Sequence, residues 1–549
     1  MPAQSVRGGK NIIICSDGTG NTAIKGRGTN VFKIFESIDL NGHRFNPDVA
    51  PQVAIYDDGV GTEDWKVAKV FSGAFGYGLG RNVRQLYKEL CRIYDHGDRI
   101  YLFGFSRGAF TVRTLAGLIA RCGIINVAKV CSGNEFEEVV GRAYAAYRDC
   151  YRTALMRRFR GKLDGKSAAE FSFRYCHPPG RIHFIGVWDT VDSVGLPLRI
   201  ADVVNSTLYA FKFPNLELSD RVDHAYHALS IDDDRRSFHP LLWDERNRRG
   251  KEGETNKQVL EQVWFAGVHS NVGGGYAKQG MSLVALDWMM GRAEASGLRF
   301  VAAERAQYRD HANVDDKLYD PRSGLGVFYR WAPRDVESLC AASGMQPALH
   351  LSVLERIAHG TDDYCPGNLP PNAKVVISPT GELNKDAAAM HRANEAQAVL
   401  MGSHRDGGTL LNKVRHAVRI GQNSHRVFLT TCLGLVAFAL ASNVELALSW
   451  AYPWQIAKAL WQQPMVLSAI IVGYLISATL AYYTDSRMLG AFSQFWFLNQ
   501  QQLRAALKRA RKAAQQLDDQ GRRGRDRENY LPRDPANASD FGTEEPAAP

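Results

Sequence analysis

Short apolar runs rich in β-branched and aromatic residues recur along the first 300 residues of the chain, and polar, glycine-bearing loops follow several of them. The runs comprise residues 11–15, 53–61, 98–105, 181–188 and 261–268. Such runs are typical of strands that are buried on both faces of a parallel sheet. Stretches with helical periodicity, such as residues 82–94 and 282–295, alternate with them. The alternation predicts an α/β fold with a mostly parallel sheet covered by helices on both faces.

Two polar segments, residues 125–180 and 196–258, interrupt this alternation. Their helical and loop-like sequences predict insertions above the sheet. The polar loops that follow the strands should meet at one edge, because parallel strands all end on the same side. In an open α/β sheet that edge is where ligands bind. We therefore expect reactive side chains to collect at the carboxyl ends of the strands.

Two long apolar stretches lie near the C-terminus. Residues 427–444 and 459–484 carry no charged side chain, and a helix of about 20 apolar residues is long enough to cross the hydrocarbon core of a bilayer. The stretches predict a transmembrane hairpin, with Trp450, Trp454 and Trp461 of the connection at the level of the lipid headgroups. The alternative is a pair of buried core helices.

Basic residues on either side of the apolar stretches orient the predicted hairpin. Four precede the first stretch (Lys413, Arg415, Arg419 and Arg426), whereas the connection contains only Lys458. Further basic residues follow the second stretch, from Arg487 to Lys512. Because basic residues stay on the cytoplasmic side, we expect a multi-pass membrane protein of a bacterial inner membrane, with the α/β domain and the C-terminus in the cytoplasm.

These patterns divide the chain into segments. We expect a polar N-terminal tail (1–10), an α/β domain (11–300), an extension of that domain (301–400), a basic juxtamembrane linker (401–426), the hairpin (427–485), a basic amphipathic helix on the membrane surface (486–517) and a solvated tail (518–549). The tail contains too few apolar residues to form a core.

Composition adds limits on compartment and cofactors. Hydrophobic residues make up 45% of the chain, so most of it can bury a core, and the net charge is a mild +10. The nine cysteines are scattered and form no C-x-x-C pair, which argues against a disulfide framework and a structural zinc site. The N-terminus lacks the apolar segment of a secretory signal. A reduced cytosolic setting, without a cofactor or a metal, is expected.

The segment Gly104 to Gly108 has the form G-x-S-x-G. It follows a predicted strand and precedes a predicted helix, which is the context in which this pattern presents a serine nucleophile on a sharp turn. Gly104 and Gly108 are small enough to let such a turn close. Ser106 is therefore the candidate nucleophile.

A serine hydroxyl needs a base to take its proton and an acid to orient that base. Asp189 directly follows the strand 181–188, and His269 directly follows the strand 261–268. Both are thus predicted at the same sheet edge as Ser106, in the chain order Ser, Asp, His that is typical of α/β-hydrolases. Alternatives remain open. Asp189 also fits a helix N-cap, and the other candidate acids and bases are Asp192, Asp17, His224, His227 and His239.

Acyl transfer also requires hydrogen-bond donors for the developing oxyanion. The amide of Arg107, the residue after the nucleophile, is the first candidate. Gly18 and Thr19 lie in a glycine-bearing loop after the first strand and form the second candidate, with Asp17 as a brace for that loop or for the site.

Six ordered motifs resemble those of one α/β-hydrolase family, which includes the catalytic domains of type VI secretion phospholipase effectors. They span residues 16–21, 59–62, 104–108, 187–191, 227–232 and 264–276. The resemblance covers about residues 10–300 and implies an α/β-hydrolase-like fold with a serine esterase or lipase activity. It implies Ser106 as nucleophile with an Asp and a His, which we map onto Asp189 and His269. The predicted anchor and cytoplasmic placement depart from a secreted effector.

The sequence thus predicts a membrane-anchored serine hydrolase acting on an ester, such as that of a phospholipid. Two other functions compete with it. One is a non-catalytic membrane scaffold that retains the fold, and the other is a binder of nucleic acid or anionic surfaces through the basic C-terminal region. We expect a lipid or other ester substrate and no nucleic-acid partner, because the basic residues are explained by membrane orientation.

Overall fold

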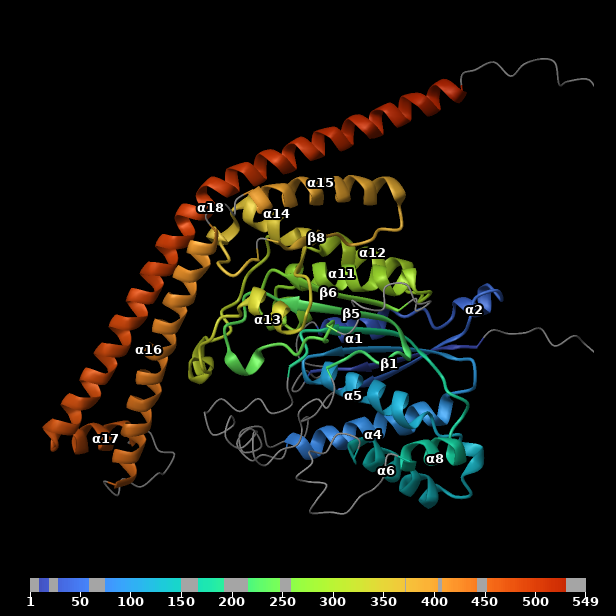
Figure 1. Cartoon of the computed structure of the whole chain (residues 1–549), viewed down its shortest axis with the longest axis horizontal. Helices are drawn as coiled ribbons and strands as arrows, with labels where there is room; N and C mark the ends of the chain where they lie inside the picture. Colours follow the sequence, from blue (N-terminus) through green and yellow to red (C-terminus); the bar gives the residue numbers. More distant parts are fainter. Residues whose placement is uncertain are drawn as a thin grey trace, which may run out of the picture.

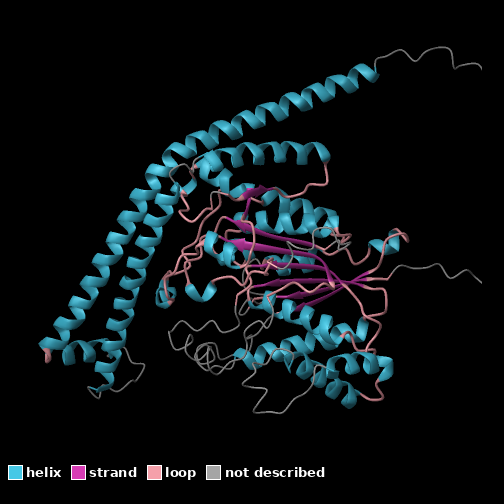
Figure 2. Cartoon of the chain, in the orientation of Figure 1, coloured by secondary structure: helices cyan, strands magenta, loops and turns pink. Residues whose placement is uncertain are grey.

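The computed structural model describes residues 9–18, 28–58, 75–149, 166–191, 216–246, 258–370, 372–402, 407–441 and 452–529. Within these ranges eight strands form one parallel sheet in the order β2-β1-β3-β4-β5-β6-β7-β8. The strands are β1 (Asn11–Ser16), β2 (Gln52–Asp57), β3 (Arg99–Phe105), β4 (Ile182–Trp188), β5 (Val222–Ser230), β6 (Val259–Phe265), β7 (Ala348–His350) and β8 (Lys374–Val376). Figure 2 shows the sheet between helices. The predicted α/β class is confirmed.

Alternate side chains of each strand supply the cores on the two faces of the sheet. In β1, Ile12 and Ile14 belong to one core, whereas Ile13 and Cys15 belong to the other, and all four are fully buried. Burial on both faces explains why this strand is a continuous apolar run.

Two sets of helices cover these cores. The first face packs against α4 (Phe75–Ile93), α5 (Arg107–Cys122), α6 (Gly133–Asp149) and α8 (Lys166–Tyr175). The second packs against α1 (Asn30–Ser37) and α11 (Gly280–Ala295). Other short elements in the described residues are α2 (Gly42–Phe45), η1 (Val127–Lys129), η2 (Arg236–Phe238), α10 (His269–Gly273), α12 (Ala302–His311), η3 (Gly324–Phe328), α13 (Val336–Ala342) and η4 (Thr361–Asp363). Part of the segment 125–180, predicted as an insertion, therefore forms α6 and α8 on the sheet face.

Strand β5 corrects the prediction for residues 196–258. We expected insertions there, with His224 and His227 in a helix and a loop, but β5 lies inside the sheet between β4 and β6 and contains both histidines. Asp223, His224 and His227 interrupt the apolar residues of this strand, so its sequence lacks the continuous apolar run that marks its neighbours. The sheet also continues beyond residue 300, because β7 and β8 add to its edge.

The C-terminal part of the chain consists mainly of long helices: α14 (Leu351–His359), α15 (Leu383–Gly402), α16 (Gly407–Ala441), α17 (Tyr452–Trp461) and α18 (Pro464–Asn529). Figure 1 shows α16 and α18 side by side, projecting away from the sheet, with α17 at their far end. Ser424 and Ser477 join the two helices, because the hydroxyl of each donates to the backbone carbonyl of the other, at 2.7 and 3.1 Å.

One helix stretch in the described residues, Pro464–Arg487, is long and apolar enough to cross a membrane. Its apolar side chains face outward, as Met465 (86% exposed) and Leu475 (61% exposed) show. The other predicted span, 427–444, lies in α16 up to Ala441, and its last residues are outside the described ranges, as is Trp450. The two-span hairpin is therefore not confirmed.

We expected the basic helix of residues 486–517 to lie on the membrane surface, but part of it packs against protein. Leu503 and Leu507 of α18 are buried in the core that α14 and α15 also enter. Gln500 and Arg504 donate to backbone carbonyls at the C-terminus of α14, among them those of Ile357 and His359 at 3.0 Å each. The apolar face of this segment is thus occupied by protein. The helix also continues to Asn529, beyond the predicted start of the solvated tail at residue 518.

Candidate active site

Ser106 stands at the turn between β3 and α5. Its backbone has φ 58° and ψ −120°, a conformation that a residue with a side chain rarely adopts. The glycines on either side permit the turn. A Cβ atom at Gly108 would lie 2.1 Å from the backbone oxygen of Ser16, and one at Gly104 would lie 2.7 Å from Cα of Ala109. These contacts explain why G-x-S-x-G is required here.

Asp189 is the first residue after β4 and is fully buried, with φ 39°. Its carboxylate accepts a hydrogen bond from the backbone amide of Ser230 at 3.1 Å, and its own amide donates to Ala228 at 2.8 Å. Both contacts hold Asp189 against the end of β5. Its side chain is hydrogen bonded to the imidazole Nδ1 of His269 at 2.5 Å.

His269 is the first residue of α10 and is 4% exposed. Its backbone amide donates to Oδ2 of Asp233 at 3.2 Å. The ring of Phe105 lies 4.6 Å from the imidazole, between centroids, and the ring of Phe238 lies 5.0 Å away in an edge-on arrangement. Since Phe105 immediately precedes Ser106, His269 and Ser106 occupy the same edge of the sheet. The hydroxyl of Ser106 makes no hydrogen bond to His269 in the described part of the chain, and such bonds are often longer before substrate binds.

The electrostatics of the pair favour a charged acid and a neutral base. Burial alone would raise the pKa of Asp189, but the charge and hydrogen bonds of Arg334, together with the hydrogen bond from His269, hold this pKa well below its usual range. Burial lowers the pKa of His269, and Asp189 only partly opposes this effect. At neutral pH the pair is therefore an aspartate and a neutral imidazole.

Asp17 braces the end of β1. Its carboxylate accepts hydrogen bonds from the hydroxyls of Thr29 at 2.6 Å and Tyr56 at 2.7 Å, and from the amide of Gly18 at 2.6 Å. Burial raises the pKa of Asp17 to about 6. The amide of Gly18 is thus directed toward Asp17. Arg107 is the first residue of α5, next to Ser106, and Thr19 and Asp192 lie outside the described residues.

Comparison with known proteins identifies the family. The profile described as "T6SS, Phospholipase effector Tle1-like, catalytic domain" matches residues 10–292, more than half of the chain. The chain belongs to this family. An uncharacterised protein of Saccharomyces cerevisiae, YEL023C, is 29% identical over 259 residues, which are 44% of this chain and 34% of the yeast protein. The chain thus matches only about a third of the length of that curated relative.

Arg334 lies outside the segment that matches the family, and our sequence reasoning missed it. Its guanidinium contacts both carboxylate oxygens of Asp189, at 2.7 and 2.8 Å, and both side chains are completely buried. The residue comes from an irregular segment before α13 and carries no motif. No pattern in the sequence could have indicated this contact, because it depends on the tertiary fold.

Asp233 supports His269, although no motif in the sequence marks it. It is fully buried and accepts hydrogen bonds from the guanidinium of Arg235 at 2.6 and 3.0 Å and from the amide of His269. Asp232 is partly buried and accepts a hydrogen bond from the amide of Gly267 at 2.6 Å. The turn therefore fixes the backbone that carries His269.

The competing histidines have other partners. In β5, His227 accepts a hydrogen bond at Nε2 from the amide of Thr190 at 3.1 Å, and burial lowers its pKa to about 3. His239 donates from Nε2 to the carbonyl of Ala332 at 2.7 Å. Of the candidate bases, only His269 is hydrogen bonded to Asp189 in the described residues.

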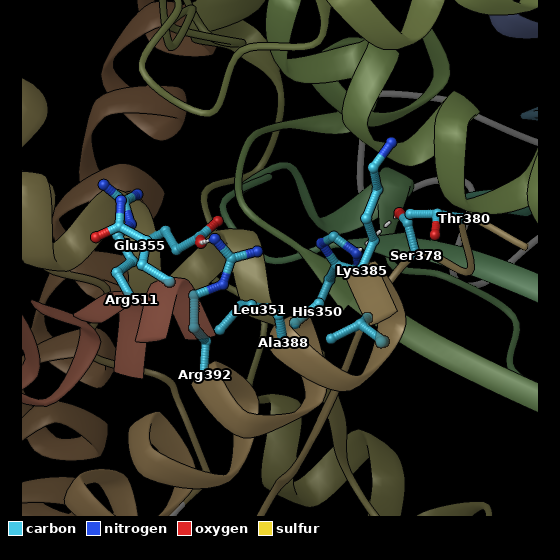
Figure 3. A pocket seen from close by; sticks show the side chains of 12 residues that line it. His350, Leu351, Glu355, Ser378, Thr380, Lys385, Ala388, Arg392 and Arg511 are labelled. Atoms are coloured by element: carbon cyan, nitrogen blue, oxygen red, sulfur yellow. Dashed lines mark hydrogen bonds and ion pairs between the residues drawn. The ribbon is translucent and has the colours of Figure 1, made fainter. Parts of the chain in front are cut away.

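A separate cavity of about 500 Å³ lies between α14, α15 and α18, and none of the candidate active-site residues that the structure describes lines it. Figure 3 shows the side chains around it, including Lys385, Arg392, Arg511 and Glu355. Arg392 lies 4.0 Å from Glu355, and Lys385 pairs with Glu382. The imidazole of His350 is hydrogen bonded to Ser352 and Ser378. These pairings account for most of the polar groups in the cavity.

Proposed function

We propose that this protein is a membrane-anchored serine hydrolase that cleaves a carboxylic ester of a lipid, such as a phospholipid, through an acyl-enzyme. The observation that carries the proposal is the buried Asp189–His269 hydrogen bond, which stands at the edge where β3 turns sharply at Ser106. An acid–base pair beside a serine on a strained turn is the arrangement of serine hydrolases. The family's description, which names phospholipase effectors, supports a lipid as substrate.

In the proposed reaction Oγ of Ser106 attacks the carbonyl carbon of the ester, and its proton passes to Nε2 of His269. Asp189 accepts the Nδ1–H bond of His269 and stabilises the imidazolium that forms. The tetrahedral intermediate then expels the alcohol, which takes the proton from His269 and leaves the acyl group on Ser106. Water, deprotonated by His269, hydrolyses this acyl-enzyme and releases the carboxylic acid.

The oxyanion of the tetrahedral intermediate requires backbone donors. We assign the first to the amide of Arg107 at the N-terminus of α5, where helix amides lack intrahelical acceptors. The loop of Gly18 and Thr19 is the proposed source of the second. The Gly18 amide already donates to Asp17. The second donor is therefore either the amide of Thr19, or the amide of Gly18 after its hydrogen bond to Asp17 has broken.

Hydrolysis of lipid vesicles tests this function. The full-length protein in detergent should release free fatty acid from phospholipid vesicles, and Ser106→Ala should abolish the release. Ser132→Ala is the matched control, because Ser132 is exposed and only caps the start of α6. Equal fatty-acid release by Ser106→Ala and the wild-type protein would refute the serine mechanism.

We further propose that the hairpin of residues 427–485 anchors the protein in a bacterial inner membrane, with the catalytic domain and the C-terminus in the cytoplasm. The outward-facing apolar side chains of Pro464–Arg487 support one span. Its close pairing with α16, through Ser424 and Ser477, supports a second. A C-terminal tag should be digested by protease in inverted membrane vesicles and protected in spheroplasts. The opposite pattern would overturn this orientation.

A further inference from the structure

We propose that Arg334 is a positioning residue for the active site: its guanidinium holds the carboxylate of Asp189 ionised and correctly oriented for His269. The inference rests on the proposed function, since it assigns a role within that reaction. It also implies that the segment matching the family depends on the C-terminal extension, because residue 334 lies beyond the matched residues 10–292. Four observations carry the argument.

The first is the geometry of the ion pair. One guanidinium nitrogen lies 2.7 Å from Oδ1 of Asp189 and the other lies 2.8 Å from Oδ2, so the contact is bidentate. A bidentate contact fixes the plane of the carboxylate as well as its position. The same Oδ2 is the atom that bonds to His269. The orientation of the acceptor of His269 is therefore set directly by Arg334.

The second is the anchoring of the guanidinium itself. The same two nitrogens donate to the carbonyls of Ser230 and Phe238, at 2.5 Å each. Ser230 ends β5, and Phe238 places its ring edge-on against His269. A lysine could not reach these acceptors together, because its ammonium is a single point rather than a planar fork.

The third is burial. Asp189 and Arg334 have no exposed side-chain surface. Removing a carboxylate from water favours its protonated form unless a cation lies close by. A protonated Asp189 would stabilise the imidazolium of His269 far less. Arg334 thus allows the acid to be both buried and charged.

The fourth is the way the backbone of Arg334 is held. Asn368 donates to the carbonyls of Arg334 at 2.9 Å and Ile231 at 3.1 Å. The next residue, Asp335, caps α13 and pairs with Arg415 of α16 at 3.0 Å. Arg334 therefore stands where the extension and the base of the long helices meet the active site.

Other charges also act on His269, and a pH test must separate them from Arg334. The charged and titratable groups that act on the Asp189–His269 pair include Asp233, Arg235, Arg334 and His227. Asp233 is neutralised mainly by Arg235. Loss of the Arg334 charge should make addition of a proton to the Asp189–His269 pair easier, so the acidic limb of activity should move to higher pH.

The rate at which a fluorophosphonate labels the full-length protein, measured against pH, tests the proposal. In Arg334→Gln we expect the acidic midpoint to rise by about one pH unit or more, and the maximal rate to fall about 100-fold through misplacement of the base. Arg334→Lys keeps the charge, so its midpoint should stay at the wild-type value while its maximal rate falls. Arg356→Gln is the control, because Arg356 is equally buried in the extension but pairs with Asp362.

The outcomes separate the positioning role of Arg334 from the serine hydrolase function itself. A folded Arg334→Gln variant with the wild-type midpoint would overturn the positioning role, as would an equal shift in Arg356→Gln. If Arg334→Gln does not fold, wild-type labelling by Arg334→Lys would overturn it, and a reduced rate at an unchanged midpoint would support it. Absence of labelling in the wild-type protein would instead refute the serine hydrolase function, and this inference with it.

Discussion

Nδ1 of His269 lies 2.5 Å from Oδ2 of Asp189, although 80 positions separate the two residues in the chain. The contact forms because Asp189 follows β4 and His269 follows β6, and parallel strands place their carboxyl ends at one edge. The turn after β3 brings Ser106 to that edge as well.

Replacement of Asp189 by asparagine should reduce the hydrolytic rate by about 10⁴-fold, as loss of the acid does in serine hydrolases generally. The amide cannot stabilise the imidazolium, and Arg334 is left buried without its counter-ion. Steady-state hydrolysis of a soluble ester measures the effect. Asp223→Asn is the control, because Asp223 pairs with Arg181 near the surface and its loss should leave the rate unchanged. A variant Asp189→Asn within tenfold of the wild-type rate would contradict the assignment.

Activity should be lost on the acidic side through protonation of His269. The base must be neutral to accept the Ser106 proton, and its folded-state pKa is lowered from its ordinary value by burial. The rate should therefore be full at pH 7 and should fall with a midpoint below about pH 6.5. A kcat/KM profile against pH, recorded with a control for unfolding at low pH, checks this. A midpoint above pH 7 would show that another group acts as base or that His269 is exposed.

Replacement of Gly108 by alanine should destabilise the protein by about 1–3 kcal/mol and reduce labelling at Ser106. The added Cβ would meet the backbone oxygen of Ser16 at 2.1 Å, and that strand cannot move without disrupting the sheet. Gly141 in α6 is the matched control, since a Cβ there meets no atom within 4 Å in the part of the chain that the structure describes. Gly141→Ala should stabilise the protein by about 0.5–1 kcal/mol. Thermal unfolding of both variants compares them, and equal midpoints would contradict the tight turn.

Much of the active-site edge can be predicted from the sequence, because Ser106 and Asp189 directly follow apolar strands and His269 lies just beyond another. Each of these residues lies at most a few positions after a strand that the sequence marks as a continuous apolar run. Arg334 cannot be predicted in this way, because it reaches Asp189 across 145 positions from a segment without regular structure. The burial of Asp233 was missed for the same reason, since its partners appear only when the chain folds.

For the C-terminal region, the sequence predicts helices but does not predict what their apolar faces contact. The sequence predicts helices for the two apolar stretches and for the basic segment 486–517, but composition does not distinguish a helix face that contacts lipid from one that contacts protein. Leu503 and Leu507 contact the extension, whereas Met465 and Leu475 are exposed. The difference depends on α14 and α15, whose position the sequence does not reveal.

Close packing of α16 against α18 should depend on Gly473. A Cβ at this position would lie 2.3 Å from Oγ1 of Thr431, so Gly473→Leu should force the helices apart and cost about 1–3 kcal/mol. Gly434→Leu is the control, because a Cβ there has no neighbour within 4 Å among the described residues. Thermal unfolding in detergent should show a lower midpoint for Gly473→Leu only. Equal unfolding midpoints for Gly473→Leu and Gly434→Leu would mean that α16 and α18 do not pack together at this point.

The most direct test of the proposed function is the site at which a fluorophosphonate attaches to the folded, full-length protein, determined by mass spectrometry of its peptides. Our account predicts a single modified residue, Ser106, and loss of the modification in His269→Ala. Labelling of a different serine, or no labelling of the folded protein, would contradict the assignment of Ser106 as nucleophile.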